Sequence, residues 1–214
     1  YLADSEATSQ RTAATIAEEG TEDSSPAGEL KVHFIDVGQG DATLITCDGQ
    51  SMLIDAGNNS KGTQVQNYLQ SQGIDTLDYV VGTHPDADHI GGLDVILYKF
   101  DCGTVILPPV ANDTKTYDDV VATMKNKSYS ATAPTVGDTY TLGSATFTIV
   151  APVGSYGSNL NDWSVAILLQ NGSNRFLFTG DAGEASEADM LASGVDLSAD
   201  VYKVAHHGSN TATT

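Results

Sequence analysis

The sequence has few basic residues. Nine Lys and Arg stand against 28 Asp and Glu across 214 residues, which gives a formal net charge of −19. A uniformly acidic surface repels polyanions, so this chain alone is expected to bind duplex DNA weakly. Bound divalent metal ions would reverse the sign of the charge only locally.

Cysteines and long apolar runs are also scarce. The two cysteines, Cys47 and Cys102, could pair, but Cys47 lies within a strand pattern, so we favour two free thiols. No apolar run reaches the roughly 18 residues that a membrane span requires. A hydrophobic content of 40% and a length of 214 residues suit one globular α/β domain with a sizeable core. The oligomeric state stays undetermined.

Composition divides the chain near residue 30. Residues 1–29 are rich in Ala, Ser, Thr and Glu, which predicts a linker, a stalk or an N-terminal arm, and residues 30–214 form the predicted domain. The chain has no initiator Met and no signal peptide, so we expect Tyr1 to begin a mature or trimmed protein. A secreted or cell-surface protein tethered by the stalk is the favoured interpretation. A cytoplasmic protein with an ordered arm is the alternative.

The stretch richest in potential metal ligands is residues 80–92, VVGTHPDADHIGG. It places four potential metal ligands within six residues: His84, Asp86, Asp88 and His89. Alternate residues of an extended segment point to opposite sides, so His84 and Asp86 can face one point and Asp88 with His89 a neighbouring one. An acidic turn with two chance histidines is the alternative, but four potential ligands at metal spacing favour a metal site. Gly91 and Gly92 would let another backbone approach closely.

Strands that end at acidic residues precede and follow this stretch. Residues 31–37 and 42–46 have strand patterns separated by DVGQGD, and Asp48-Gly49 predicts a hairpin into residues 52–54. Asp55 follows that strand, as Asp181 follows the strand at residues 175–178. A further strand, residues 200–204, leads to His206-His207. Gly38 and Gly40 match a G-x-G pattern, but no helix follows, so a dinucleotide site is rejected.

Helical patterns alternate with these strands. They cover residues 61–72, residues 88 or 89 to about 100, residues 114–126 and residues 183–193. Hairpins at residues 139–150 and around Asn171-Gly172 interrupt any simple βαβ series. This mixture predicts an α/β fold of two mixed sheets packed face to face with outer helices.

The H-x-D-x-D-H-x-G-G string of residues 84–92 resembles the signature of the metallo-β-lactamase superfamily. Asp86, where most members have His, makes it most similar to the hydrolase domain of ComEC-type competence proteins and their stand-alone secreted bacterial relatives. The strand–GQGD–strand–hairpin–DAG order of residues 31–57 resembles the opening of the same family. The resemblance implies a four-layer αββα sandwich. Relatives continue beyond an HHGS string, whereas this chain ends five residues after it, so we expect a C-terminally incomplete domain.

Carried over, the resemblance implies two divalent metal ions. One would be held by His84, Asp86 and Asp181. The other would be held by Asp88, His89, Asp181 and one of the paired histidines, with His206 favoured over His207. Alternatively, Asp181 is an N-cap residue and the histidines are a surface pair.

One position departs from the family in a way that bears on the metal. Where many relatives have a His before the strand leading to Asp181, this chain has Asn159 or Asn161. With Asp86, this makes the first site rich in oxygen. The expected ions are Mn²⁺ or Zn²⁺. The oxygen-rich first site favours a hard ion such as Mn²⁺ or Mg²⁺ over zinc.

The resemblance implies a metal-dependent hydrolase. Our first interpretation is a dinuclear phosphodiesterase or nuclease-like enzyme that uses a metal-bridging hydroxide and cleaves small or short phosphodiesters. The proton for the leaving group would come from Asp88, from a water, or from His207 if His206 ligates metal. An ester, lactone or β-lactam hydrolase is the second interpretation, and a non-catalytic, metal-holding surface-binding module is the third.

Other polar and aromatic residues have simpler interpretations. Asp36, Asp41 and Asp55 are expected to shape turns or orient ligands. Trp163 is expected in the core, with a place in the substrate wall as the alternative. Lys203 is expected to be solvated at a strand edge, with pairing to a phosphate as the alternative.

Overall fold

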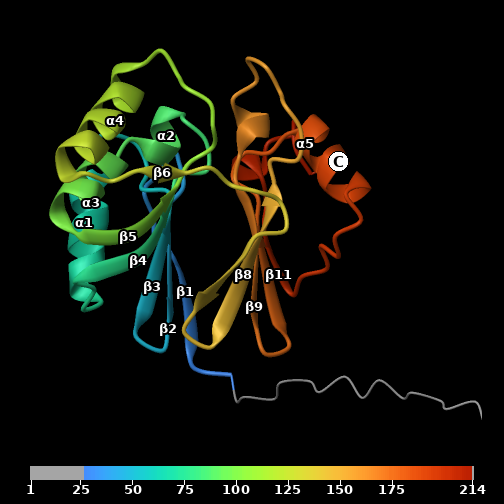
Figure 1. Ribbon diagram of the computed structural model, residues 1–214, viewed down its shortest axis with the longest axis horizontal. Helices are drawn as coiled ribbons and strands as arrows, with labels where there is room; N and C mark the ends of the chain where they lie inside the picture. The colour runs from blue at the N-terminus through green and yellow to red at the C-terminus, as the bar shows by residue number, and fades with distance from the viewer. Residues whose placement is uncertain (1–26, 214) are drawn as a thin grey trace, which may run out of the picture.

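The computed structural model describes residues 27–213, which fold into two β-sheets packed face to face with helices outside them (Figure 1). The first sheet has the order β1 (Leu30–Phe34), β2 (Thr43–Cys47), β3 (Gln50–Ile54), β4 (Thr76–Val81), β5 (Asp101–Ile106) and β6 (Ala131–Thr132). The second has the order β11 (Val201–Lys203), β10 (Asn174–Phe178), β9 (Ala166–Asn171), β8 (Ala145–Ala151) and β7 (Thr139–Leu142).

Helices cover both outer faces. The first sheet carries α1 (Gly62–Ser71), α3 (Leu93–Lys99) and α4 (Lys115–Lys127), and the second carries α5 (Glu184–Ala192), as Figure 1 shows. The predicted four-layer αββα sandwich is confirmed. The predicted N-terminal arm lies outside the described residues except for residues 27–29. Within the described part of the chain, no helix is both long and apolar enough to cross a membrane.

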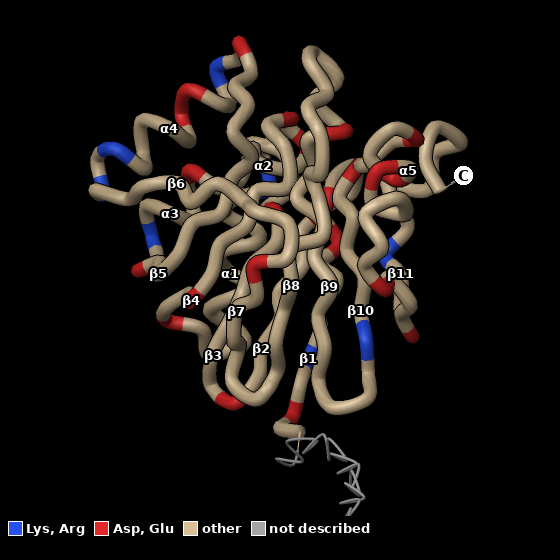
Figure 2. Tube along the Cα trace, turned by 45° about the vertical axis from the view of Figure 1, so that its right-hand side comes forward, with Lys and Arg blue, Asp and Glu red and all other residues tan. Residues whose placement is uncertain are grey.

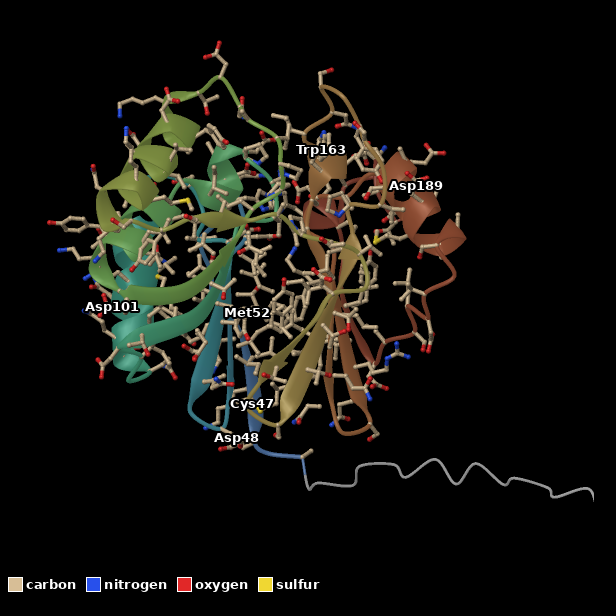
Figure 3. The ribbon with its side chains drawn as sticks, in the orientation of Figure 1. Cys47, Asp48, Met52, Asp101, Trp163 and Asp189 are labelled. Atoms are coloured by element: carbon tan, nitrogen blue, oxygen red, sulfur yellow. The ribbon has the colours of Figure 1, made fainter. Side chains whose placement is uncertain are left out.

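Three apolar layers hold the sandwich together. Between the sheets lie fully buried side chains such as Met52, Phe147 and Ile167, and Figure 3 shows Met52 in this layer. A second layer joins α1, α3 and α4 to the first sheet, and a smaller third joins α5 to the second sheet. Cys47 is buried and both cysteines are free.

Tight turns connect the antiparallel strands where the sequence predicts them. Asp48 and Gly49 link β2 to β3 with φ angles of 49° and 82°, positive values typical of the turn that matches the twist of a two-residue hairpin. Gly172, with φ 59°, follows Asn171 between β9 and β10. The predicted hairpin at residues 139–150 is present as β7 and β8, so all three predicted hairpins are confirmed.

The predicted helix from residue 88 or 89 to about residue 100 is wrong, because two short helices replace it. A helix α2 (Ala87–Ile90) ends at Gly91-Gly92 before α3 begins. A Cβ on Gly91 would lie 2.3 Å from the backbone N of Asn59, and one on Gly92 would lie 2.3 Å from the carbonyl oxygen of Ala56. The close backbone approach predicted for these glycines is therefore present, and it fixes α2 against the end of β3.

Strand direction brings the chemically active segments to one edge. The strands β3, β4 and β5 are parallel to one another in the first sheet, and β10 is parallel to β11 in the second. The amide of Val165, just before β9, donates to Thr83 after β4 (2.8 Å), and the amide of His206, after β11, donates to Gly180 after β10 (3.1 Å). Because β9 runs antiparallel to β10, these bonds bring the carboxyl ends of β4, β10 and β11 to the same edge. Residues that follow these strands gather there.

Candidate metal centre

The site is built from loops at this shared edge. Asp55 follows β3, His84 follows β4, Asp181 follows β10, and the 3₁₀ turn η2 (His206–Gly208) follows β11. The helix α2 contributes Asp88 and His89. Backbone hydrogen bonds from the amide of Asp41 to the carbonyl of Asp88 (3.2 Å) and from the amide of Ala56 to the carbonyl of His89 (2.8 Å) hold these loops together.

His89 is held by a buried carboxylate. Its Nδ1 hydrogen-bonds Oδ2 of Asp55 at 2.8 Å, and Asp55 in turn accepts bonds from the amide (2.8 Å) and hydroxyl (2.7 Å) of Thr83. This arrangement points Nε2 of His89 at Oδ1 of Asp181, 3.2 Å away. A carboxylate behind an imidazole is the usual way in which proteins orient a metal-binding histidine.

His84 and Asp86 form a second group beside it. Nε2 of His84 lies 3.6 Å from Oδ2 of Asp86, and the His84 and His89 rings are 4.2 Å apart between centroids. Asn112 donates from Nδ2 to Oδ1 of Asp86 (3.2 Å) and to the carbonyl of Pro85 (3.0 Å). Asp86 therefore keeps Oδ2 facing His84, as predicted, whereas Asp88 and His89 lie in the helix α2 rather than in the predicted extended segment.

The paired histidines occupy different places. Nε2 of His207 lies 3.4 Å from Oδ2 of both Asp88 and Asp181. Nε2 of His206 lies 3.8 Å from Oδ2 of Asp181, and its Nδ1 is 2.9 Å from the hydroxyl of Thr211. The geometry favours His207 within the centre, whereas the sequence favours His206. The choice of His206 as ligand stays a prediction.

Four side chains can offer ligand atoms that all lie within 4.8 Å of one another: Asp41, His89, Asp181 and His207. The sequence predicted a turn or orienting role for Asp41, which is the last residue of the GQGD motif. Lys203 was expected at a solvated strand edge. Instead, its ammonium is ion-paired with Asp41 and its side chain is 18% exposed, so that expectation is wrong.

Several buried polar atoms of the centre have no hydrogen-bond partner among the described residues. They are Nε2 of His84, Nε2 of His89 and Oδ1 of Asp181. Nε2 of His89 and Oδ1 of Asp181 lie 3.2 Å apart but do not meet hydrogen-bond geometry, and a buried polar atom that makes no hydrogen bond costs free energy. All three atoms are good metal ligands, so divalent ions bound beside Asp181 would satisfy them. The residues therefore fit the group that the sequence predicts.

The centre has an electrostatic character that suits a cation. Burial opposes ionisation of Asp181, but His89, His84 and His207 together lower the pKa of this carboxyl to about 2. His84 holds the pKa of Asp86 below its ordinary value. Burial pushes the pKa of His89 down, yet the carboxylates of Asp55 and Asp181 outweigh it and raise that pKa well above its ordinary value.

Metal binding is expected to release a proton from the centre. With its pKa raised, His89 keeps its proton to a higher pH than an ordinary imidazole when no metal is bound, and an imidazole must lose this proton to ligate a metal. Affinity should therefore rise with pH until His89 is neutral in the metal-free protein. Calorimetric titration at pH 7 in two buffers of different ionisation enthalpy should show release of about one proton per protein. Identical heats in both buffers would contradict this.

The alternative interpretation of Asp181 as a helix N-cap is wrong. Gly183 occupies that position of α5, and Asp162 supplies the cap from η1 (Asn161–Trp163) by accepting from the amides of Gly183 (2.9 Å) and Ser186 (3.3 Å). The carboxylate of Asp181 is thus free to face the histidines. Asp162 was not recognised from sequence because its cap is 21 residues distant.

A cavity of about 690 Å³ opens beside Asp181 and His206. Its walls include Asn159, Asn161 and Glu184, so both Asn positions noted in the sequence reach the site. Trp163, labelled in Figure 3, is the last residue of η1, and its Nε1 donates to the carbonyl of Gly157 (3.1 Å). Trp163 is only partly buried, so its expected place in the core is wrong.

A two-sheet sandwich with imidazoles and carboxylates at the shared edge of its sheets defines a class of metal-dependent hydrolases. The family model described as the metallo-beta-lactamase superfamily matches residues 35–214. The chain belongs to this superfamily. Its members generally use divalent metals, usually zinc, and the fold together with the cluster supports a metal-dependent hydrolase.

Curated relatives include competence proteins, as the sequence predicted. "Recombination protein 2" of Haemophilus influenzae is 33% identical over 189 residues, covering 86% of this chain and 22% of that protein. "ComE operon protein 3" of Bacillus subtilis is 25% identical over 205 residues, covering 87% of this chain and 26% of that protein. The chain therefore spans about a quarter of the length of these relatives.

Solved structures share the fold at low identity. The metallo-beta-lactamase SMB-1 superposes with a TM-score of 0.59 at 15% identity, covering 85% of this chain and 78% of that one. A metallo-beta-lactamase of Cronobacter sakazakii gives a TM-score of 0.56 at 12% identity, covering 80% and 76%. These similarities support the architecture alone.

Proposed function

We propose that this chain is a phosphodiesterase that uses two divalent metal ions and acts on small or short phosphodiesters. The observation that carries the proposal is the convergence of His89, His206 and His207 on the buried carboxylate of Asp181. The His84–Asp86 pair beside it supports a second ion position. The relatives named for recombination and competence favour a substrate related to DNA.

The ions, when bound, would supply Lewis acidity toward the scissile phosphate and lower the pKa of a water nucleophile. The chain's own groups account for the proton balance. Attack of water on phosphorus breaks the bond to the leaving oxygen, which must gain a proton. Asp88, with a side chain 31% exposed beside His207, can take the proton that the attacking water loses on one carboxylate oxygen and pass it to the leaving oxygen. With His207 inside the centre, the imidazole on the cavity wall is His206, which becomes the second candidate donor.

Charge around the cavity favours a small substrate. No Lys or Arg of residues 27–213 lines the 690 Å³ cavity, whose volume suits a single ligand of modest size. Five of the nine basic residues lie on or beside the outer helices α1, α3 and α4, and Figure 2 shows lysines on α3 and α4. A polyanion requires cations along its path, so we expect short substrates to be preferred.

The metal-loaded chain is expected to hydrolyse bis-p-nitrophenyl phosphate, with faster turnover in Mn²⁺ than in Zn²⁺. The reason is that Asp86 and the two Asn side chains offer oxygen where an imidazole would favour zinc. Nitrocefin and simple esters should be poor substrates. The measurement is steady-state turnover of each substrate after removal of metal and reloading with one ion at a time.

Binding measurements separate the remaining possibilities. A short single strand and a 30-base-pair duplex are titrated by fluorescence anisotropy at 150 mM salt with Mn²⁺. Both should bind weakly, and the dissociation constant for the duplex should lie above the micromolar range. Submicromolar duplex binding would instead favour a nuclease of long DNA. Turnover of nitrocefin alone would favour a lactam hydrolase. Metal binding without turnover of any substrate would favour a non-catalytic surface-binding module.

A further inference from the structure

Lys203 reaches the centre from the second sheet. It is the last residue of β11, and its ammonium pairs with Oδ2 of Asp41, which precedes β2 of the first sheet. The two side chains are 18% and 11% exposed. Thr43, Phe178 and Gly180 line the narrow space around the pair. Among the described Lys and Arg, this is the one found in an ion pair with a residue of the centre.

The other oxygen of Asp41 faces a histidine. Oδ1 lies 3.4 Å from Nδ1 of His207, while Nε2 of the same ring lies 3.4 Å from Asp88 and from Asp181. His207 also has a left-handed backbone, with φ 53°, which a non-glycine residue keeps only when its surroundings impose it. The contacts to Asp41 and the neighbouring carboxylates are such surroundings.

The same arrangement occurs on the opposite side of Asp181. Asp55 lies behind Nδ1 of His89 and points Nε2 of that ring at Asp181. Asp55 is fixed by the two bonds from Thr83, whereas Asp41 is fixed by the ammonium of Lys203. Two carboxylate–imidazole pairs thus flank Asp181, and they differ in the group that holds the carboxylate.

We propose that Lys203 is a positioning residue that keeps Asp41 behind His207 and out of the metal coordination shell. The inference deepens the proposed function, because it rests on the same metal centre. With Oδ2 occupied by a localised cation, Asp41 has only Oδ1 left, and that oxygen orients His207. Metal binding at His207 then depends on Lys203, although the lysine touches no ligand atom.

The direction in which metal affinity changes when Lys203 is replaced distinguishes a positioning role from a simple electrostatic one. Removing a positive charge near a dication would by itself tighten metal binding. If Lys203 positions His207 through Asp41, its removal weakens metal binding instead. The loss expected for an outer partner of a metal ligand is about 10- to 100-fold.

The test is titration of the metal-free full chain with Mn²⁺ by calorimetry. Lys203→Met and Asp41→Asn should each weaken binding at least about tenfold. The double variant should bind about as weakly as Asp41→Asn alone, because the two residues act on one ring. Lys203→Arg, which keeps the charge, should stay near the original affinity. Lys115→Met is the matched control, since Lys115 is 85% exposed on α4 and should leave affinity unchanged.

A spectroscopic measurement reports the coordination shell directly. The visible absorption of the Co²⁺-loaded protein should shift in Lys203→Met and be unchanged in Lys115→Met and Lys203→Arg. If Lys203→Met fails to fold, as judged by circular dichroism, Lys203→Gln takes its place with the same expected direction. Unchanged or tighter Mn²⁺ binding in the neutral variants would overturn the inference. If the variants lose metal affinity as expected but the original chain does not hydrolyse phosphodiesters, the proposed function is refuted and this inference stands.

Discussion

Replacement of Asp181 by Asn is expected to lower the affinity for divalent metal by more than about 100-fold, beyond the loss typical of an outer partner. Asn keeps the shape of the side chain but replaces the anionic carboxylate by a neutral amide, which offers one weak carbonyl oxygen and cannot supply two ligand oxygens. Asp181 faces the Nε2 atoms of His89, His206 and His207, at 3.2, 3.8 and 3.4 Å, so both ion positions lose a shared ligand. Calorimetric titration and metal content after dialysis measure the loss.

Asp101→Asn is the matched control for this change. Asp101 begins β5, its side chain is 89% exposed, and Figure 3 shows it on the outer side of the first sheet, away from the centre. The control should keep its metal and its turnover. A wild-type metal content in Asp181→Asn would show that the ions, if present, are held elsewhere.

Asp88→Ala is expected to reduce turnover of bis-p-nitrophenyl phosphate by about 10²- to 10⁴-fold, the range typical of a lost proton-transfer group. Asp88 lies on α2 with Oδ2 3.4 Å from Nε2 of His207, and its side chain is 31% exposed. Because it is not buried, truncation to Ala should leave no cavity and the fold should persist. One bound ion should be lost as well, since Asp88 is a predicted ligand of the second site.

Asp118→Ala serves as the comparison, because Asp118 is an exposed acidic residue in the first turn of α4. Turnover and thermal unfolding are measured together for both variants. Loss of activity in Asp88→Ala with an unchanged melting temperature supports the assigned role. Activity within a few-fold of the original in Asp88→Ala would remove this residue from the mechanism.

Local signals predicted most of the fold. The hairpin at Asp48-Gly49 follows from residues that accept positive φ, and α4 follows from a cap at Thr114 and buried Val120 and Met124. The break between α2 and α3 was missed because both glycines are needed for contacts with Asn59 and Ala56, about 30 residues earlier. A helical period in sequence does not reveal such a close approach.

The centre was predictable only where its ligands share a motif. His84, Asp86, Asp88 and His89 lie in one loop and helix start, so their grouping follows from spacing. The pairing of Asp41 with Lys203 joins the two sheets, and it depends on how the sheets pack. The difference between His206 and His207 depends on two successive left-handed residues, with φ 47° and 53°, which no pattern in the sequence indicates.

The most direct test of the two-ion centre is anomalous X-ray scattering from crystals of the Mn²⁺-loaded chain, collected on both sides of the manganese absorption edge. Two peaks are expected beside Asp181, one between His84 and Asp86 and the other among Asp88, His89 and His207. The ions should lie about 4 Å apart, as in other two-metal sites. A single peak, or peaks away from Asp181, would contradict a dinuclear centre.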